Sequence, residues 1–445
     1  MNTAATPEAR PVPLPTHYRR NLFLLIADFV FFMVGITFVS GQTVLPDFVG
    51  RLSGSEVLVG LVGILFPLGV MLPQLVVAPM AARAPSKRLW IIKAGFPGRL
   101  MMFVVAGGIL LFGVENPLPV LVIVVLGVGM FAVCDGITAV AWMDLLSNAL
   151  PNTRRGRLFG LGRAIASIAV LLVVSDLVRY ILDAETGPSY PHDYMLLFFL
   201  AGIFMLLSIS MFLFVREPAK ARPVEMPSAS RRGYLAFLGQ VLRQDRRYRH
   251  FLATRLTYQV ALIAAPFYIR FATESLAIPS AVAVSGAIQV TTIGSLVAGL
   301  AMGRLSEKRG SRAVILMTCA FALAQPAMAL VAGAGAVWPI YLTFALMGMT
   351  TAAYEPGMLN WIIEYADDSR RAVYYSLTSA FNLIGVLSPG LGGVIAESLS
   401  YEALFVVALS LSLLALMLAL RLVEPRALTR SEVSVAVAET APATQ

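Results

Sequence analysis

Four carboxylates of this chain lie well inside long apolar stretches of sequence. They are Asp28, Asp135, Asp176 and Glu355. A carboxylate that is shielded from water binds a proton more readily, because its charged form loses solvation. Such a group can take up a proton from one side of a barrier and release it to the other side as its access to water changes. These positions are therefore the first candidates for chemistry.

Glu355 is the strongest of these candidates, because Pro356 and Gly357 follow it directly. A proline inside a helix leaves a backbone carbonyl without its partner one turn earlier and lets the helix bend. A carboxylate at such a bend can change its exposure to water when the helix moves. We expect Glu355 to couple proton movement to function, with Asp135 and Asp28 as the next candidates.

A structural role is the alternative for the other carboxylates. Asp28 and Asp135 could pair with Arg99 or Arg163 and lock neighbouring helices together.

Asp176 has Arg179 three residues later, a spacing that favours a local ion pair. Five uncharged polar residues within apolar stretches could bind a ligand or could equally bond between helices. These are Gln42, Tyr258, Gln259, Gln289 and Asn382.

The elements that position these residues must be membrane helices. The chain has 445 residues, of which 58% are hydrophobic and 13% charged, and its mean hydropathy is +0.79. That composition supplies too little polar surface to cover a soluble globule of this size. Cys134 and Cys319 both lie in apolar runs, so the sequence contains neither a disulfide framework nor a metal-ligand spacing. The net charge of +9 belongs to short loops rather than to a nucleic-acid-binding face.

A spanning helix needs roughly 20 mostly apolar residues, and the sequence contains twelve such runs. They lie at 21–45, 57–80, 89–113, 119–146, 158–182, 194–215, 250–272, 280–302, 312–334, 338–363, 373–396 and 402–422. We expect an all-α membrane protein built as two six-helix bundles. The expected segments are a tail over 1–20, a bundle over 21–215, a linker over 216–249, a bundle over 250–422 and a tail over 423–445.

The second part of the linker combines apolar residues at helical spacing with arginines on the opposite side. Tyr234, Phe237, Leu238 and Val241 illustrate this spacing, which predicts a helix lying in the headgroup layer.

Lys and Arg residues fall almost entirely on one side of the predicted spans. Of the 34, all except Arg51, Arg179 and Arg270 lie in the termini, the linker and alternate loops with their flanking turns. Short loops rich in Lys and Arg remain cytoplasmic. We therefore expect a multi-pass protein of the bacterial inner membrane with both termini in the cytoplasm.

The two halves carry an internal repeat, which is clearest in the fourth and tenth runs. Asp135 precedes Asp144 by nine residues, and Glu355 precedes Glu364 by nine residues. Parallel repeats of six helices place a substrate site between the two halves near the membrane midplane.

The loop Gly303-Arg304-Leu305-Ser306-Glu307-Lys308-Arg309-Gly310-Ser311-Arg312 resembles the signature G-x-L-a-D-R-x-G-r-R of the major facilitator superfamily. The corresponding first-half loop, at 78–88, keeps the basic positions and loses the glycines and the acid. With the twelve runs and the long central loop, the resemblance covers essentially the whole chain. It implies that the first, fourth, seventh and tenth helices line a central cavity, which Asp28, Asp135 and Glu355 would then face.

The resemblance also implies that the signature loops form a cytoplasmic gate that holds the two halves closed on that side. We expect Lys308 or Arg309 to bond to Glu364, and Arg83 to bond to Asp144. The predicted gate comprises Arg83, Lys87, Arg88, Asp144, Gly303, Glu307, Lys308, Arg309, Gly310, Arg312 and Glu364. The stretch at 385–393, rich in Gly and Pro, is similar to a motif that the family's drug antiporters carry in the fifth helix, but here it lies in the other half and does not establish antiport. Close helix packing through small residues is the alternative explanation.

These features together favour a secondary active transporter of a small organic molecule. It would work by alternating access as a proton-coupled monomer in the lipid bilayer, without a cofactor, a metal or nucleic acid. Few polar residues lie within the spans, which favours export of an apolar or amphipathic compound. Uptake of a polar metabolite and a receptor or sensor on the same fold are the alternatives. An enzyme is disfavoured, because His17, His192 and His250 are scattered among loops and helix ends.

Overall fold

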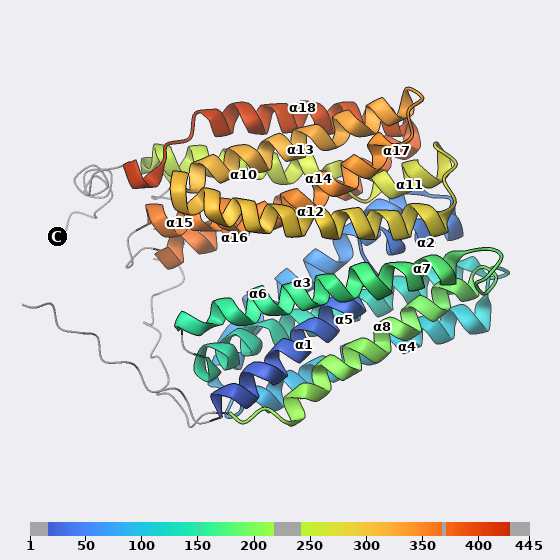
Figure 1. The fold of residues 1–445 in the computed structure, drawn as a ribbon, viewed down its shortest axis with the longest axis horizontal. Coiled ribbons are helices and arrows are strands. Elements are labelled where there is room, and N and C mark those ends of the chain that lie inside the picture. The colour runs from blue at the N-terminus through green and yellow to red at the C-terminus, as the bar shows by residue number, and fades with distance from the viewer. Residues whose placement is uncertain (1–16, 151, 218–241, 367–370, 428–445) are drawn as a thin grey trace, which may run out of the picture.

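The computed structural model describes residues 17–150, 152–217, 242–366 and 371–427. Within these ranges the chain is helical and contains no strand, as the sequence predicts. Figure 1 shows two layers of helices, with the first half of the chain in one layer and the second half in the other.

Helices of the first half follow the six predicted runs in order. They are α1 (Tyr18–Phe38), α2 (Val44–Ser53), α3 (Glu56–Arg83), α4 (Lys87–Phe112), α5 (Pro117–Ala149), α6 (Asn152–Ala169), the π-helical segment η1 (Val170–Val174), α7 (Ser175–Leu182), α8 (His192–Ser210) and the 3-10 segment η2 (Met211–Leu213). The first run, 21–45, is thus formed mainly by α1 and ends where α2 begins, and the fifth is formed by α6, η1 and α7.

Helices of the second half follow the other six runs. They are α10 (Arg246–Ala261), η3 (Leu262–Ala264), α11 (Phe267–Glu274), α12 (Ser280–Arg309), α13 (Ser311–Gly333), α14 (Pro339–Tyr354), the π-helical segment η4 (Glu355–Leu359), α15 (Asn360–Tyr365), α16 (Arg371–Val386), α17 (Ser388–Ser398), α18 (Tyr401–Leu420) and η5 (Pro425–Ala427).

Ten stretches of the described chain are long and apolar enough to cross a membrane. The predicted runs at 250–272 and 338–363 are the other two, and each consists of shorter helical pieces. Pro266 explains the first interruption, because it has no N–H to donate to the helix. In the second, Pro356 lies inside η4, where the sequence predicts a bend.

Side-chain caps fix where several of these helices begin. Ser55, Ser86, Asp245 and Ser400 each accept a hydrogen bond from a backbone N–H of the following first turn. Such caps satisfy donors that have no partner within the helix. They hold α3, α4, α10 and α18 at defined ends of the bundles, where the polar networks described below are found.

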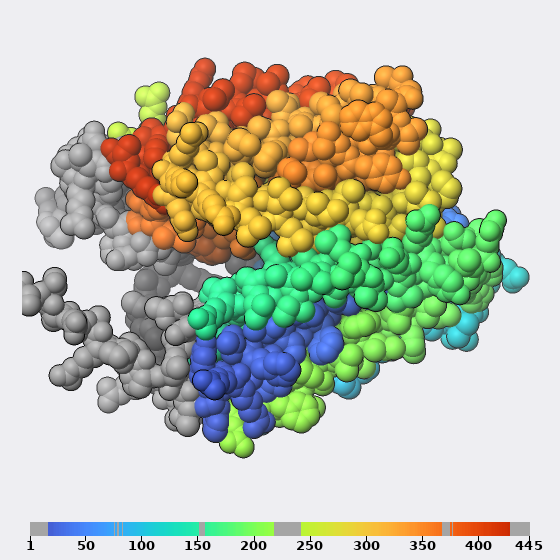
Figure 2. Space-filling model, in the orientation of Figure 1, coloured from blue at the N-terminus to red at the C-terminus, as the bar shows by residue number. Residues whose placement is uncertain are grey.

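Three helix pairs make the most extensive contacts between the two halves. These are α2 with α11, α3 with α17, and α7 with α12. In Figure 2 the face where α7 meets α12 forms a continuous contact between the halves. All three pairs involve the ends of the helices that lie away from the chain termini in Figure 1. The helix predicted within the linker lies mostly outside the described residues, as do most of the two predicted tails.

Candidate functional site

Asp28 and Asp135 belong to a buried polar cluster inside the first half. Asp28 on α1 accepts hydrogen bonds from the indole N–H of Trp142, at 2.9 Å, and from the hydroxyl of Ser208, at 2.5 Å. Asp135 on α5 forms an ion pair of 2.8 Å with Arg99 on α4. Four helices of one half therefore contribute to the cluster.

A cavity of about 200 Å³ adjoins these groups. Its polar lining comes from Asp28, Arg99, Asp135, Thr138, Trp142 and Ser208, and its apolar lining from Phe29, Phe32, Met33, Ile91, Ala139, Ile209 and Phe212. With both carboxylates ionised, the cluster carries one more negative than positive charge. Uptake of a single proton would neutralise it, which is a favourable step in a medium that penalises net charge.

Arg99 is held in this cluster by aromatic rings as well as by Asp135. Its guanidinium lies 4.9 Å from the ring centre of Phe32 and 5.0 Å from that of Phe131. The Nε and Nη1 atoms of Arg99 are buried and bond to no group of the described chain. The arginine therefore keeps donors available for a change of partner.

Of the two arginines considered for Asp135, the structure places Arg99 beside it and not Arg163. Asp28 bonds instead to two uncharged donors. The ion pair expected between Asp176 and Arg179 is not seen in the described residues. Asp176 accepts a hydrogen bond of 3.3 Å from Gln289 of the other half, so the local pairing is corrected to a contact between halves.

Glu355, the first candidate from sequence, lies at the start of η4. Its side chain is exposed and makes no hydrogen bond or ion pair with the described residues. The neighbouring Tyr354 hydroxyl instead accepts a hydrogen bond from Arg255 on α10. The structure therefore does not bring Glu355 into the buried cluster that holds Asp28 and Asp135.

Among the uncharged candidates, some side chains make hydrogen bonds to other side chains of the described residues and others do not. Gln259 on α10 donates to Asn382 on α16, and Gln289 donates to Ser175 at 3.2 Å as well as to Asp176. Tyr258 is buried and stacks on Tyr354 with ring centres 6.1 Å apart. Gln42 is exposed in the break between α1 and α2.

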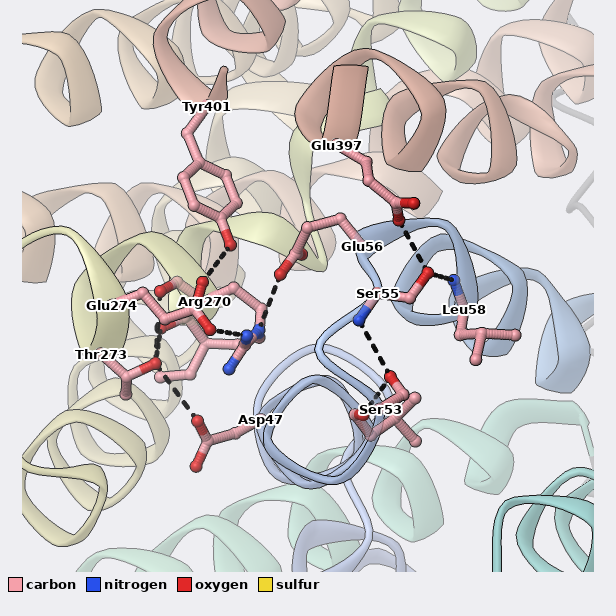
Figure 3. A network of polar contacts seen from close by, with 12 residues as sticks. Asp47, Ser53, Ser55, Glu56, Leu58, Arg270, Thr273, Glu274, Glu397 and Tyr401 are labelled. Carbon is pink, nitrogen blue, oxygen red and sulfur yellow. Dashed lines mark hydrogen bonds and ion pairs between the residues drawn. The ribbon is translucent and has the colours of Figure 1, made fainter. Parts of the chain in front are cut away.

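A network of polar contacts joins the two halves at the end away from the termini (Figure 3). Arg270 on α11, of which 1% is exposed, donates to Glu56 of the first half at 3.1 Å. It also pairs with Glu274 of its own helix, which in turn accepts a hydrogen bond of 2.8 Å from the Tyr401 hydroxyl. The guanidinium is thus shared between a carboxylate of each half.

A second chain of contacts runs beside this pair. Thr273 donates to Asp47 of the first half at 3.2 Å, and Asp47 also accepts a hydrogen bond from the Tyr194 hydroxyl. Arg51 donates to the same hydroxyl and lies 4.3 Å from the ring centre of Tyr190. Burial raises the pKa of Tyr190 to about 12, so that this phenol stays neutral beside the arginine.

Glu397 of α17 completes the contact by capping a helix of the other half. It accepts hydrogen bonds from the Ser55 hydroxyl at 2.7 Å and from the Val57 N–H at 2.9 Å, both at the start of α3. An anionic group at a helix N-terminus is stabilised by the helix dipole and by the free N–H groups. This cap crosses from one half to the other.

Glycines allow the backbones to approach closely at this junction. A Cβ at Gly60 would lie 2.3 Å from the Pro389 carbonyl oxygen, and one at Gly393 would lie 2.4 Å from the Glu56 carbonyl oxygen. Gly50 lies directly beneath the Arg270 guanidinium. The packing role expected for the Gly- and Pro-rich stretch at 385–393 is confirmed for its last residues.

The first signature loop, at the end nearer the termini, bonds within its own half. Asp144 pairs with Lys87 at 3.3 Å, which corrects the expected pairing with Arg83. Glu217 accepts hydrogen bonds from Ser86 and from the Lys87 N–H, and Arg88 donates to the carbonyl of residue 215 at 3.3 Å. Lys87 reaches the acid because it begins α4, whereas Arg83 ends α3 with its side chain exposed.

The second signature loop behaves in the same way. Glu364 bonds to Arg426, at 2.5 Å, and to the Ser311 hydroxyl, at 2.9 Å, and not to Lys308 or Arg309. The sequence did not single out Arg426 as the partner of Glu364, because Arg426 follows the last span and reaches the loop only in the folded chain.

The remaining residues of this loop turn the chain between α12 and α13. Gly310 has φ +82°, which favours glycine, and lies against Glu424, whose carboxylate accepts from the Arg312 N–H at 3.0 Å. The Glu307 carbonyl accepts from Arg426, and Gly303 lies on α12 with open space around it.

Comparisons with known proteins identify related sequences and folds. A sequence model described as Major Facilitator Superfamily matches residues 251–443. The resemblance to the major facilitator superfamily is confirmed. No curated protein sequence matches the chain significantly.

Solved structures of the same superfamily fold cover nearly the whole chain. The nucleoside transporter NupG aligns with a TM-score of 0.69 and 14% identity, over 91% of this chain and 99% of that one. The D-xylose-proton symporter aligns with a TM-score of 0.66 and 14% identity, over 93% and 100%. The E. coli fucose:proton symporter FucP aligns with a TM-score of 0.56 and 15% identity, over 91% and 98%. These similarities show the major facilitator fold, and the long apolar helices are those of a multi-pass membrane protein.

Proposed function

We propose that this protein is a proton-coupled secondary transporter of a small organic molecule that works by alternating access. The observation that carries the proposal is the one-sided contact between its halves. Arg270, Thr273 and Glu397 bond across the halves at one end. At the other end, Asp144 and Glu364 of the predicted gate bond within their own halves. This arrangement corresponds to access from the side of the termini, which the distribution of Lys and Arg assigns to the cytoplasm.

The contact at the closed end is built so that it can open. Removing one partner of a buried ion pair costs about 3–5 kcal/mol, because the other charge is left uncompensated. Arg270 avoids this cost, since it holds Glu56 of the other half and Glu274 of its own helix together. When the halves separate, Arg270 keeps Glu274 as its partner.

Proton coupling is assigned to the cluster of Asp28, Arg99 and Asp135. The cluster combines an excess negative charge with a cavity of about 200 Å³. Asp28 is the carboxylate that protonation would disturb least, because its partners Trp142 and Ser208 are uncharged. Two of the similar structures are proton symporters, which supports proton coupling in general.

Two substrate classes are favoured by different observations. The scarcity of polar residues within the spans favours export of an apolar or amphipathic compound. The nucleoside and sugar transporters among the similar structures favour uptake of a polar metabolite. A thermal-shift screen of purified protein against both classes identifies the ligand before transport is measured.

Flux into proteoliposomes then separates a transporter from a receptor on the same fold. With the ligand from the screen, the proposal predicts saturable uptake that responds to an imposed pH gradient and stops when a protonophore collapses it. Specific ligand binding without flux in either direction would show a receptor or sensor. Saturable flux that does not respond to the pH gradient would contradict only the proton coupling and would leave the transport function standing.

A further inference from the structure

A basic pocket lies at the termini end of the second half, outside the contacts described above. It is open, has a volume of about 510 Å³, and is formed where the start of α10 meets the end of α18. Its lining residues are Arg246, Arg247, Arg249, His250, Trp361, Arg421, Leu422 and Val423. Four arginines from two segments far apart in sequence therefore converge on one hollow.

The carboxylates around this pocket are engaged elsewhere. Asp245 accepts hydrogen bonds from the hydroxyls of Tyr365 and Tyr374 and caps α10. Glu364 is paired with Arg426, and Glu424 accepts from the backbone of the loop between α12 and α13. The four pocket arginines form no ion pair within the described ranges. Their positive charge is therefore available to an anion.

The pocket wall is rigid. Trp361 stacks face to face on Phe251, with ring centres 4.1 Å apart and an angle of 4° between the rings, and also stacks on Tyr365. Its indole N–H donates to the carbonyl of Val423 at 3.1 Å. His250 bonds to the carbonyl of Leu418 at 2.9 Å, which ties α10 to α18. The arginines thus project from a preformed scaffold rather than from a loose loop.

An apolar stripe leads away from the pocket along α18. Met417 and Leu414 precede Arg421 by four and seven residues, so they lie on the same face of the helix. Leu413 and Leu420 flank them, and all four side chains are exposed. A charged hollow at a helix end, followed by an exposed apolar face, has the shape of a phospholipid: a headgroup site with a path for its acyl chains.

We propose that this pocket binds the phosphate headgroup of an anionic phospholipid from the leaflet on the side of the termini. Each Arg near a membrane surface attracts anionic lipid, and basic pockets between helices on the cytoplasmic side suit multiply charged headgroups. A soluble phosphate compound would share the headgroup chemistry but would make no use of the stripe on α18.

Native mass spectrometry of the detergent-solubilised protein with added phosphatidylglycerol tests the proposal. The variant R249A/R421A removes two exposed pocket arginines, and the control R19A/R304A removes two exposed arginines outside it. We expect the pocket variant to bind phosphatidylglycerol roughly 30-fold more weakly than the wild type. The control should bind like the wild type, and phosphatidylcholine should bind weakly to all three.

Thermal stability with soluble and lipid probes gives the second measurement. Phosphatidylglycerol should raise the unfolding temperature of the wild type and the control, and inorganic pyrophosphate should raise it less. Equal binding of phosphatidylglycerol by the pocket variant, or an equal loss in the control, would overturn the site. Stabilisation by pyrophosphate that matches or exceeds that by phosphatidylglycerol would overturn the assignment to lipid.

Discussion

At the scale of residues, the partner of each buried charge decides its role. Asp135 is already paired with Arg99, so its protonation would leave a guanidinium uncompensated. Asp28 is bonded by neutral donors and can accept a proton without that cost. Glu355 has the sequence context of a functional carboxylate, but it lies exposed and outside the buried cluster. The structure therefore moves the first test of proton coupling from Glu355 to Asp28.

Substitution of Asp28 by asparagine keeps the shape and removes the titration. We expect Asp28→Asn to retain ligand binding and to lose accumulation driven by a pH gradient, by about tenfold for each pH unit of the gradient, because one proton supplies about 1.4 kcal/mol per pH unit. Glu355→Gln is the matched control and should accumulate ligand like the wild type. Gradient-driven accumulation that survives in Asp28→Asn and fails in Glu355→Gln would reverse the assignment. The measurement is ligand uptake into proteoliposomes.

The second prediction at the scale of residues concerns Arg270. Arg270→Gln leaves Glu56 buried at the junction without its charged partner, so the closed contact should weaken by about 3–5 kcal/mol. We expect a lower unfolding temperature and greater access of thiol reagents to a cysteine placed at Ser55. Arg304→Gln, at an exposed position, is the control and should change neither. A normal unfolding temperature and a protected Ser55→Cys in the Arg270 variant would count against its role.

At the scale of elements, the two halves meet through close helix crossings that only glycine permits. The crossing of α3 and α17 depends on Gly60 and Gly393, where an added Cβ would overlap the opposing backbone. We infer that this crossing closes the end away from the termini and that its geometry sets how tightly the end closes.

A larger residue at the crossing should hold that end apart. Gly60→Leu is expected to favour the state open away from the termini and to slow ligand flux by about tenfold or more, since overpacking typically costs 1–3 kcal/mol. Gly299→Leu on α12 is the control, because a Cβ there meets nothing within 4 Å. Cross-linking of cysteines placed at Ser55 and Glu397 measures the closed state. Unchanged cross-linking in Gly60→Leu would contradict the prediction, because it would show that the larger side chain does not hold this end open.

The elements were largely predictable, and the pairings between them were not. Hydropathy and the placement of Lys and Arg act over short stretches, so the spans and the signature loop are readable directly. The contact between Glu56 and Arg270 joins residues 214 positions apart, and nothing local specifies it. One feature of the sequence could have pointed to this junction, because Arg51 and Arg270 are among the few basic residues on the Arg-poor side. For Glu364, several arginines lay within reach, and only the tertiary structure selects Arg426.

At the scale of the whole molecule, the proposed function makes this structure one of two alternating states. Its halves are bonded to each other at one end, while the signature loops at the other end are bonded within their halves. The proposed alternating access would explain this asymmetry, because rigid halves that rock about a central site open one end as they close the other. A ligand shifts such an equilibrium only by its difference in affinity between the two states.

Distances between spin labels at both ends of the molecule test this account most directly. One label pair at Asn116 and Val337 reports the end away from the termini, and a second pair at Leu89 and Arg304 reports the other end; all four positions are exposed. Double electron–electron resonance in lipid nanodiscs, with and without the ligand and in acidic and alkaline buffer, should show reciprocal changes. The account predicts that the Leu89–Arg304 distance shortens in the same conditions in which the Asn116–Val337 distance lengthens. Distances that stay fixed at both ends in every condition, or that lengthen together, would contradict alternating access.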